Sequence, residues 1–380
     1  MQAELKLAVS GLIILSVVLS SNPDLHIPLL SENNELSSET RIHNADIKDD
    51  YLRIGYFPNL NHAPAIIQHD DEELNFLKDG DNLRNITISN NIFSSEHALI
   101  EALYADKIDI AYVNPSTIID SYLLLGDRDF RIISGLSSGG VSFVVRNDSG
   151  IESVSDLGGK IFAIPQLDNP QDISLRKYLV DNGFDTVENG GNVTVVGLKP
   201  VEIIKQFQNK MIDGAWVPEP IPTTLIQQVD GKIFVNERDL WPDGKFVSGN
   251  IIVRTDYLME NPDIIRKFLE AHVEEISWIN QQLSITNNTN VDEKYESEIV
   301  SVFNNELKNI TGKTFPDNQL APALSKIEFT TDPLPQSLYR IVKDTQDLGL
   351  IKMGLNWNEE LDKIYDTTIL DEVLRENRLQ

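Results

Sequence analysis

Polar residues that could hold a ligand gather at a turn in residues 165–172 (PQLDNPQD). The turn follows a short apolar run and precedes an amphipathic one, which is typical of a strand that leads into a helix. This pattern predicts that Asn169 is the helix N-cap and that Pro170 is the first helical residue. The side chain of Asp172 is then placed to form a hydrogen bond with the cap residue. Free backbone N–H groups and the positive end of the helix dipole then face the space in front of the helix N-terminus. Two interpretations stay open: a ligand-binding turn and an ordinary capped surface helix.

Other polar turns follow the remaining apolar runs of the chain. In an open parallel sheet, ligands bind beyond the carboxyl ends of the strands, so we expect these turns to lie around one site. Most of the residues are neutral donors, and several precede helix N-termini, which could together hold an anion without a buried lysine or arginine. The candidate ligand-binding residues are Asn61, His62, Ser95, Asn114, Ser138, Gly139, Gly140, Gln166, Asn169, Gln171, Trp216 and Glu219.

Three of these candidates have a second interpretation. His62 lies in a loop after a strand, where it could touch a ligand or hold the loop by a hydrogen bond. Trp216 could stack on an organic ligand or belong to the core. Glu219 stands between two prolines and could receive an amine or order its own loop.

Patterns of established catalytic and metal sites are almost absent. The six histidines show no HExxH spacing, no phosphate-binding glycine motif occurs, and the absence of cysteine excludes thiolate chemistry and disulfides. Residues 135–139 (GLSSG) match the G-x-S-x-G nucleophile elbow, but an elbow needs a helix directly after the serine. Here two glycines and an apolar β-branched run follow, so we expect a glycine-rich crossing segment or a turn. We expect no catalytic residue, no metal and no cofactor.

The length and charge of the chain narrow its class. With 380 residues it is long enough for two domains with their own cores. Its formal net charge of −27 argues against nucleic acid or an anionic membrane surface as a partner, because phosphate contacts need a basic face.

The N-terminal residues predict export. An apolar run over residues 5–19 is too short for a full bilayer span and suits a signal peptide, with an uncleaved signal anchor as the alternative for residues 1–21. Residues 22–50 are polar and predict a tether. The expected location is the periplasm or the outer face of the cell membrane, with membrane contact only through this segment or a permease.

The elements that must position the candidate residues alternate between strand and helix. Residues 51–57, 86–93 and 107–113 predict strands, which favours an α/β fold with mostly parallel sheets. Residues 94–113 and 198–217 align without gaps at an offset of 104 positions, and both lead from a helix into an apolar strand and a proline-bearing loop. One α/β unit used twice predicts two similar lobes.

Two further segments predict the connections between these lobes. Residues 139–146 and 246–254 are similar in character and predict two crossing strands. The first lobe is then expected to contain residues 51–138 and 247–380, and the second lobe residues 139–246. Helices are expected to pack on the first lobe over residues 263–280, 294–309, 336–347 and 358–376.

Several stretches of the chain resemble substrate-binding proteins of ABC importers, specifically the nitrate/sulfonate/taurine group. The resemblance rests on residues 53–68 (RIGYFPNLNHAPAIIQ), 107–115 (KIDIAYVNP), 137–140 (SSGG) with the strand after it, 156–160 (DLGGK), 165–172 and 216–220 (WVPEP). It implies a two-lobed periplasmic binding protein type II fold and a monomer without enzymatic activity. Such a protein captures a small anionic or zwitterionic solute and delivers it to an ABC permease and its ATPase.

The ligand that the resemblance favours is an aliphatic sulfonate or taurine. Nitrate and a thiamine-pyrimidine precursor are the alternatives, as is an enzyme of the same fold resembling dehydratases of menaquinone precursors. The chain departs from the pattern at Asp168 and Pro170, where small residues are expected. Asp168 adds a negative charge close to the expected anion site, which leaves the ligand open.

Overall fold

The computed structural model describes residues 50–67, 86–124, 129–288, 297–351 and 357–377. The predicted signal segment and nearly all of the predicted tether lie outside these residues. Within the described ranges, none of the helices has both the length and the apolar character that crossing a membrane requires.

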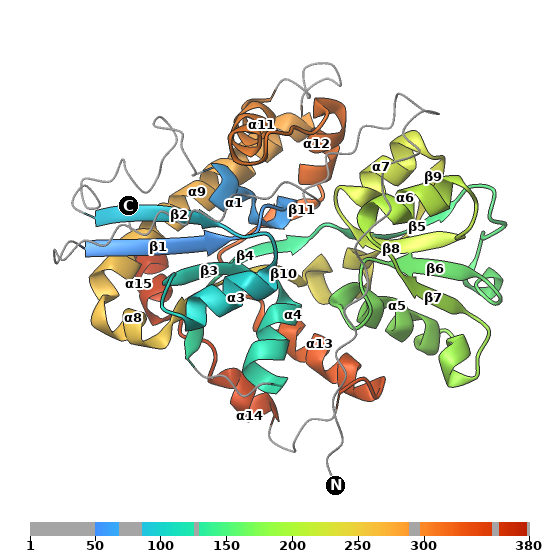
Figure 1. Ribbon diagram of the computed structural model, residues 1–380, viewed down its shortest axis with the longest axis horizontal. Helices are drawn as coiled ribbons and strands as arrows, with labels where there is room; N and C mark the ends of the chain where they lie inside the picture. Colours follow the sequence, from blue (N-terminus) through green and yellow to red (C-terminus); the bar gives the residue numbers. More distant parts are fainter. Residues whose placement is uncertain (1–49, 68–85, 125–128, 289–296, 352–356, 378–380) are drawn as a thin grey trace, which may run out of the picture.

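Two β-sheets lie side by side, each covered by helices (Figure 1). The first has the order β11-β4-β10-β3-β1-β2 and the second the order β7-β6-β8-β5-β9. The strands of the first sheet are β1 (Asp50–Tyr56), β2 (Ile86–Ile92), β3 (Ile110–Val113), β4 (Phe130–Gly139), β10 (Val247–Arg254) and β11 (Ile327–Phe329). Those of the second are β5 (Val141–Arg146), β6 (Ile161–Ile164), β7 (Thr194–Gly197), β8 (Gly214–Pro218) and β9 (Gly231–Asn236).

Both sheets are mixed, which corrects the expectation of mostly parallel sheets. In the first sheet β1 pairs in parallel with β2 and β3, whereas β10 runs antiparallel to β3 and β4. The second sheet has the same arrangement, with β6 parallel to β7 and β8 and with β5 antiparallel to β8 and β9. A strand that arrives from the other sheet enters against the direction of the parallel strands, and the sequence pattern of a single strand does not carry its direction.

The predicted internal repeat is confirmed. The helices α3 (Glu96–Tyr104) and α6 (Pro200–Gln208) and the strands that follow them begin 104 positions apart. Asp109 and Asp213 occupy equivalent places before β3 and β8. Their carboxylates accept hydrogen bonds from the backbone N–H groups of Arg53 and Ile161, both at 2.9 Å.

The remaining helices cover both faces of the sheets. Along the first part of the chain these are η1 (Leu60–His62), α1 (Ala63–Ile67), α4 (Pro115–Ile118), the π-helix η2 (Ile119–Leu124), α5 (Pro170–Asp181) and α7 (Ile221–Gln228). Short 3-10 turns lie at η3 (Val154–Asp156), η4 (Val187–Asn189), η5 (Glu237–Leu240) and η6 (Pro242–Gly244). Each sheet has a buried apolar cluster on either face, so each lobe has its own core.

The C-terminal part is helical, as expected, but differs in detail. Its helices are α8 (Thr255–Glu260), α9 (Pro262–Asn288), α11 (Glu298–Thr311), α12 (Asp317–Leu324), α13 (Pro335–Asp347), α14 (Trp357–Asp362) and α15 (Thr368–Asn377). The single helix predicted over residues 358–376 is wrong. Two helices form there because Tyr365 between them makes a β-bridge to Ile132.

Two crossings connect the sheets. The first is at Gly139 and Gly140, whose φ angles of 85° and 73° fall in the left-handed region that favours glycine. The second runs from β9 through η5 and η6 to β10, and the Phe246 N–H donates to the Ser138 hydroxyl of the first crossing at 3.2 Å. Residues 135–139 lie inside strand β4, so the motif there is no nucleophile elbow.

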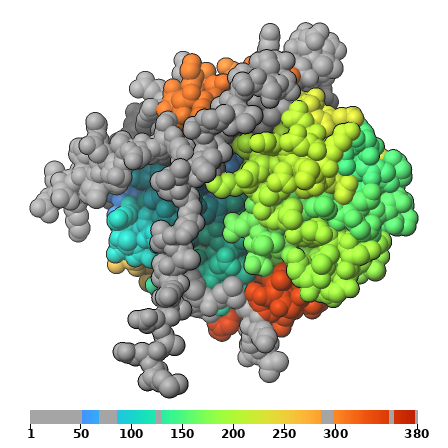
Figure 2. Space-filling model, turned by 45° about the vertical axis from the view of Figure 1, so that its right-hand side comes forward, coloured from blue at the N-terminus to red at the C-terminus, as the bar shows by residue number. Residues whose placement is uncertain are grey.

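The C-terminal helices also contact the second lobe. Helix α12 packs against α7, and α13 packs against α5. Figure 2 shows the orange-red C-terminal residues against the green and yellow surface of the second lobe. These contacts hold the two lobes together in addition to the crossing strands.

Candidate functional site

Four candidate residues lie at the crossings. Ser138 is fully buried, and its hydroxyl joins the two crossings through Phe246. The Asn61 amide donates to the Ser248 carbonyl at 3.5 Å, and its oxygen lies 3.8 Å from where a Cβ on Gly140 would be. A Cβ on Gly139 would come within 2.3 Å of Arg238 Nε, so glycine is required for that close approach.

Glu219 lies beside the same crossing. Its N–H donates to the Gly140 carbonyl at 2.8 Å, and its carboxylate accepts from the Thr223 N–H at 3.3 Å. Burial raises the pKa of Glu219 to about 7, although Lys326 and the bonds to Thr223 act in the opposite direction. Glu219 therefore orders its own loop and changes its charge near neutral pH.

Two candidates are fully buried, and their contact with a ligand stays a prediction. His62 is fully buried, its Nδ1 lies 2.8 Å from the Phe57 carbonyl, and burial lowers its pKa to about 4. Trp216 is also fully buried; it stacks on Phe143 and donates from Nε1 to Glu237 at 2.6 Å. The sequence pattern does not tell which way a side chain of η1 or of β8 is directed, and both side chains lie in packed surroundings.

The first-lobe cluster consists of Glu96, Asn114, Thr117 and Asp120. Ser95 caps α3 by accepting from the Ala98 N–H at 3.2 Å, and Glu96 follows it. The Glu96 carboxylate accepts from the Asn114 N–H at 3.3 Å and from the Thr117 hydroxyl. Among the described residues, Asn114 Oδ1 and Glu96 Oε1 are buried acceptors without a hydrogen-bond donor.

The second-lobe cluster consists of Asp168, Asn169 and Gln171 at the start of α5. Asn169 is the N-cap, as predicted, and accepts from the Asp172 N–H at 2.9 Å. The Asp172 carboxylate accepts a hydrogen bond from the Asp168 N–H at 2.9 Å, and not from the N–H of the cap residue as predicted. Gln171 accepts from the Asn169 amide at 2.9 Å, while Gln166 is exposed before the turn.

The two clusters face each other across the junction of the lobes. The negative charge of Asp168 raises the pKa of Asp120, in addition to a larger effect of lost hydration. Next to them, Ile173 of α5 packs in one apolar cluster with Ile118 and Ile119 of the first lobe. The strand-end turns of both lobes therefore meet, and their assignment to a ligand stays a prediction.

The clusters are rich in hydrogen-bond acceptors. Burial raises the pKa of Glu96 to about 7, although its bonds to Thr117 and Asn114 lower it. Asn114 Oδ1 and the carboxyl groups of Asp120 and Asp168 add further acceptors. This arrangement can bind a group that donates hydrogen bonds or carries a positive charge. No group of three or more His, Cys, Asp or Glu side chains is placed to hold a metal ion within the described ranges.

The model of the NMT1-like family matches residues 45–291 of this sequence, which is more than half of its length. The chain belongs to the NMT1-like family. The match includes both crossings, both clusters and the whole second sheet, and it extends past the end of α9.

Proteins that are similar in sequence to this chain are named as binding proteins. One, in Brucella abortus, is 28% identical over 185 residues, which cover 48% of this chain and 54% of that protein, so the chain spans about half of its length. A protein named as an aliphatic sulfonates-binding protein in Bacillus subtilis is 25% identical over 333 residues, 86% of this chain and 89% of that one.

A solved structure has the same fold. The periplasmic aliphatic sulphonate binding protein of Escherichia coli superposes with a TM-score of 0.65 at 16% identity, over 83% of this chain and 92% of that one. The two-lobed periplasmic binding protein type II fold implied by the sequence resemblance is thereby confirmed.

The sequence reasoning missed three members of the first-lobe cluster. Glu96 directly follows the predicted residue Ser95, and Thr117 lies three residues after the predicted residue Asn114, so the first turn of a helix was a usable signal for both. Asp120 carries no such signal, because only the fold brings it close to Asp168.

Proposed function

We propose that this chain is the extracytoplasmic solute-binding protein of an ABC importer. It captures a small organic solute between its lobes, in the periplasm or at the outer face of the membrane, and delivers it to a permease driven by an ATPase. The observation that carries the proposal is the pair of polar strand-end clusters, one from each lobe, that approach each other at the lobe junction through Asp120 and Asp168. The names of the relatives support the same class of protein.

The ligand that we propose is an aliphatic sulfonate, with the zwitterion taurine preferred. The carboxyl groups of Asp120 and Asp168 repel a bare anion such as nitrate and attract an ammonium group. The start of α5 offers backbone N–H groups to a sulfonate at the other end of the same molecule. A zwitterion therefore matches both charges that the junction presents.

A thiamine-pyrimidine precursor is the second candidate. Its amino groups are hydrogen-bond donors, and they suit the unpartnered acceptors Asn114 Oδ1 and Glu96 Oε1. Such a ligand needs no anion-binding helix start, so the two candidates make different demands on the second lobe.

A thermal-shift panel tests the proposal. Taurine, alkanesulfonates, nitrate and aminopyrimidines are added separately to the purified protein, and a ligand at about 100 times its Kd stabilises the folded state by roughly 2.7 kcal/mol. We expect the largest rise in Tm with taurine. No rise with any compound would contradict the assignment to solute binding.

Variants locate the response. Asn114→Ala and Asn169→Ala are expected to reduce the rise in Tm that the ligand causes. The control variant Asn189→Ala changes an exposed residue of η4 and is expected to keep the full rise. An equal loss in all three variants would indicate general damage to the protein and not a site at the junction.

A further inference from the structure

A small cavity lies at the crossings, on the side of the first sheet that carries β11. It has a volume of about 110 Å³ and is lined by Gly140, Val141, Ser142, Ile233, Asn236, Arg238, Ser325 and Lys326. This is the volume of a few water molecules, at roughly 30 Å³ each, which is also enough for a small polyatomic ion. We call it the crossing pocket.

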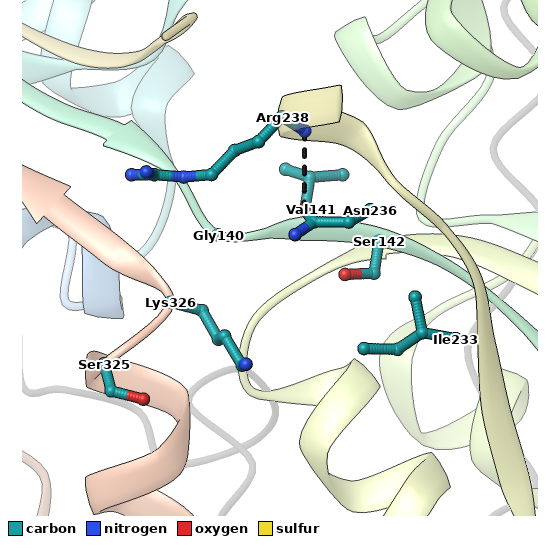
Figure 3. Close-up of a pocket in the computed structure, with 8 residues that line it drawn as sticks. All are labelled: Gly140, Val141, Ser142, Ile233, Asn236, Arg238, Ser325 and Lys326. Carbon is teal, nitrogen blue, oxygen red and sulfur yellow. Dashed lines mark hydrogen bonds between the residues drawn. The ribbon is translucent and has the colours of Figure 1, made fainter. Parts of the chain in front are cut away.

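Three hydrogen-bond donors converge on the crossing pocket. Figure 3 shows the Lys326 ammonium, the Ser142 hydroxyl and the Asn236 amide nitrogen directed into the same space. The Ser142 residue is only 8% exposed, so its hydroxyl is a buried group that opens into the cavity. Among the residues that the structure describes, none of these three groups forms a hydrogen bond or an ion pair, and the charge of Lys326 acts on the carboxyl group of Glu219.

The orientation of the Asn236 amide is fixed by its other contact. Its Oδ1 accepts from the Arg238 N–H at 3.4 Å as the N-cap of η5, so the NH2 group is the part that faces the pocket. Arg238 itself directs its guanidinium away from Lys326, toward the Ser138 carbonyl and Glu328. The pocket therefore offers donors and a positive charge.

Acidic side chains near the pocket are already engaged. Glu328 forms ion pairs with Arg238 at 3.4 Å and Lys245 at 2.8 Å. Glu219 is close enough for the Lys326 charge to lower its pKa, but its carboxylate bonds to Thr223, and it does not line the cavity. No carboxylate of the described residues thus fills the pocket.

We propose that the crossing pocket binds a small oxyanion, such as sulfate, a sulfonate head group or a carboxylate. Lys326 supplies the charge, and Ser142 and Asn236 supply two directed hydrogen bonds. An oxyanion accepts hydrogen bonds and carries a negative charge, so it is well matched to the three donors of this pocket.

The oxyanion would connect the two lobes. Lys326 lies between α12 and β11 of the first lobe, whereas Ser142 and Asn236 belong to strands of the second sheet. A bound ion favours the conformation in which the three donors converge, because it interacts with that conformation more strongly than with one in which they separate. The binding site itself does not depend on the identity of the transported solute.

Sulfate is the probe for this site. Chloride is replaced by sulfate at constant ionic strength while Tm and the heat of binding are measured for the full chain. We expect a saturable rise in Tm that is lost in Lys326→Gln, with sulfate affinity weakened by about tenfold or more. Lys308→Gln changes an exposed lysine of α11 and is expected to keep the wild-type response.

A second variant tests the direction of the amide. Asn236→Asp keeps the oxygen that caps η5 but replaces the NH2 donor with a second carboxylate oxygen, so we expect it to abolish the sulfate response while the protein stays folded. Folding is checked by the unfolding transition in chloride alone.

Two outcomes would overturn the proposal. An equal, unsaturable rise in all variants would mean that sulfate acts only by exclusion from the protein surface. A response lost in Asn169→Ala but kept in Lys326→Gln would place the ion at the strand-end clusters. If the solute panel fails while the sulfate response still depends on Lys326, the transport proposal falls and the crossing pocket stands.

Discussion

The two lobes repeat one helix–strand unit, but they surround its aspartate differently. In the first lobe the Asp109 side chain is 1% exposed and pairs with Arg53 at 2.6 Å, with Arg254 at 3.8 Å beyond it. In the second lobe Asp213 is 20% exposed and pairs with Arg146 at 3.2 Å. The same backbone unit therefore carries a buried ionic anchor in one lobe and a partly hydrated one in the other.

The strand-end clusters differ in a similar way. In the first lobe Glu96 and Asn114 each have a buried side-chain oxygen that accepts no hydrogen bond from the described residues. In the second lobe the side-chain oxygens of Asn169 and Asp172 accept hydrogen bonds from backbone N–H groups, and the Asn169 amide donates to Gln171. This difference suggests a division of roles. Under the proposed function, the first lobe would present acceptors to the solute and the second lobe an ordered helix start.

The largest expected difference between the lobes is in their anchors. Asp109→Asn leaves two arginines without their buried partner and is expected to lower the free energy of unfolding by about 3–5 kcal/mol. Asp213→Asn is expected to cost less, about 1–2 kcal/mol, because Asp213 is partly hydrated and Arg146 keeps its ion pair with Asp148. Urea denaturation of both variants measures the difference. Equal losses would mean that the anchors are equivalent despite their burial.

The paired aromatic residues of the repeat give a second contrast. Trp216→Phe leaves the buried Glu237 without one of its donors and removes ring volume, so we expect a loss of about 2–4 kcal/mol. Tyr112→Phe removes a buried hydroxyl without a hydrogen-bond partner in the described part of the chain, and we expect little change or a small gain in stability. A large loss from Tyr112→Phe, measured by the same denaturation, would show that its hydroxyl is bonded.

One carboxyl group in each lobe predicts how stability depends on pH. The folded-state pKa of Glu96 and of Glu219 is raised from 4.5 to about 7 by burial. The folded protein then holds protons that the unfolded chain releases, so stability is highest below about pH 4.5 for these groups and is lost as the pH rises toward 7 and above. Glu96→Gln and Glu219→Gln are each expected to flatten that decline in a series of Tm values. A slope that neither variant changes would assign the pH dependence to other groups.

The smallest expected effect concerns the two helix caps. Ser95→Ala and Asn169→Ala each remove one bond to a helix N-terminus and should each lower stability by about 1 kcal/mol. Only Asn169→Ala also disturbs the Gln171 amide, so we expect it to weaken solute binding more than Ser95→Ala does. Matched losses of affinity would remove the proposed division of roles between the lobes.

Local signals explain what could be predicted from the sequence. The cap at Asn169 and the proline after it act within one turn, and the 104-position repeat lies in consecutive residues, so both could be read directly. The rejection of residues 135–139 as an elbow also rested on adjacent residues and is confirmed by strand β4.

Side-chain direction and long-range contacts could not be read in this way. His62 lies in η1 and Trp216 lies within β8, and both side chains are fully buried, because packing and not spacing decides which way a side chain is directed. The crossing pocket joins Ser142, Asn236 and Lys326, which are far apart in the chain and stand in no common motif. Only the paired sheets bring them together.

The central claim is that one solute is held jointly by both lobes, and calorimetric titration of the solute that most raises Tm tests it most directly. The account predicts one binding site per chain, with Asn114→Ala in the first lobe and Asn169→Ala in the second each weakening the affinity by about tenfold, as the loss of a hydrogen bond to a charged group would. Unchanged affinity in both variants, or the absence of any binding solute, would contradict it.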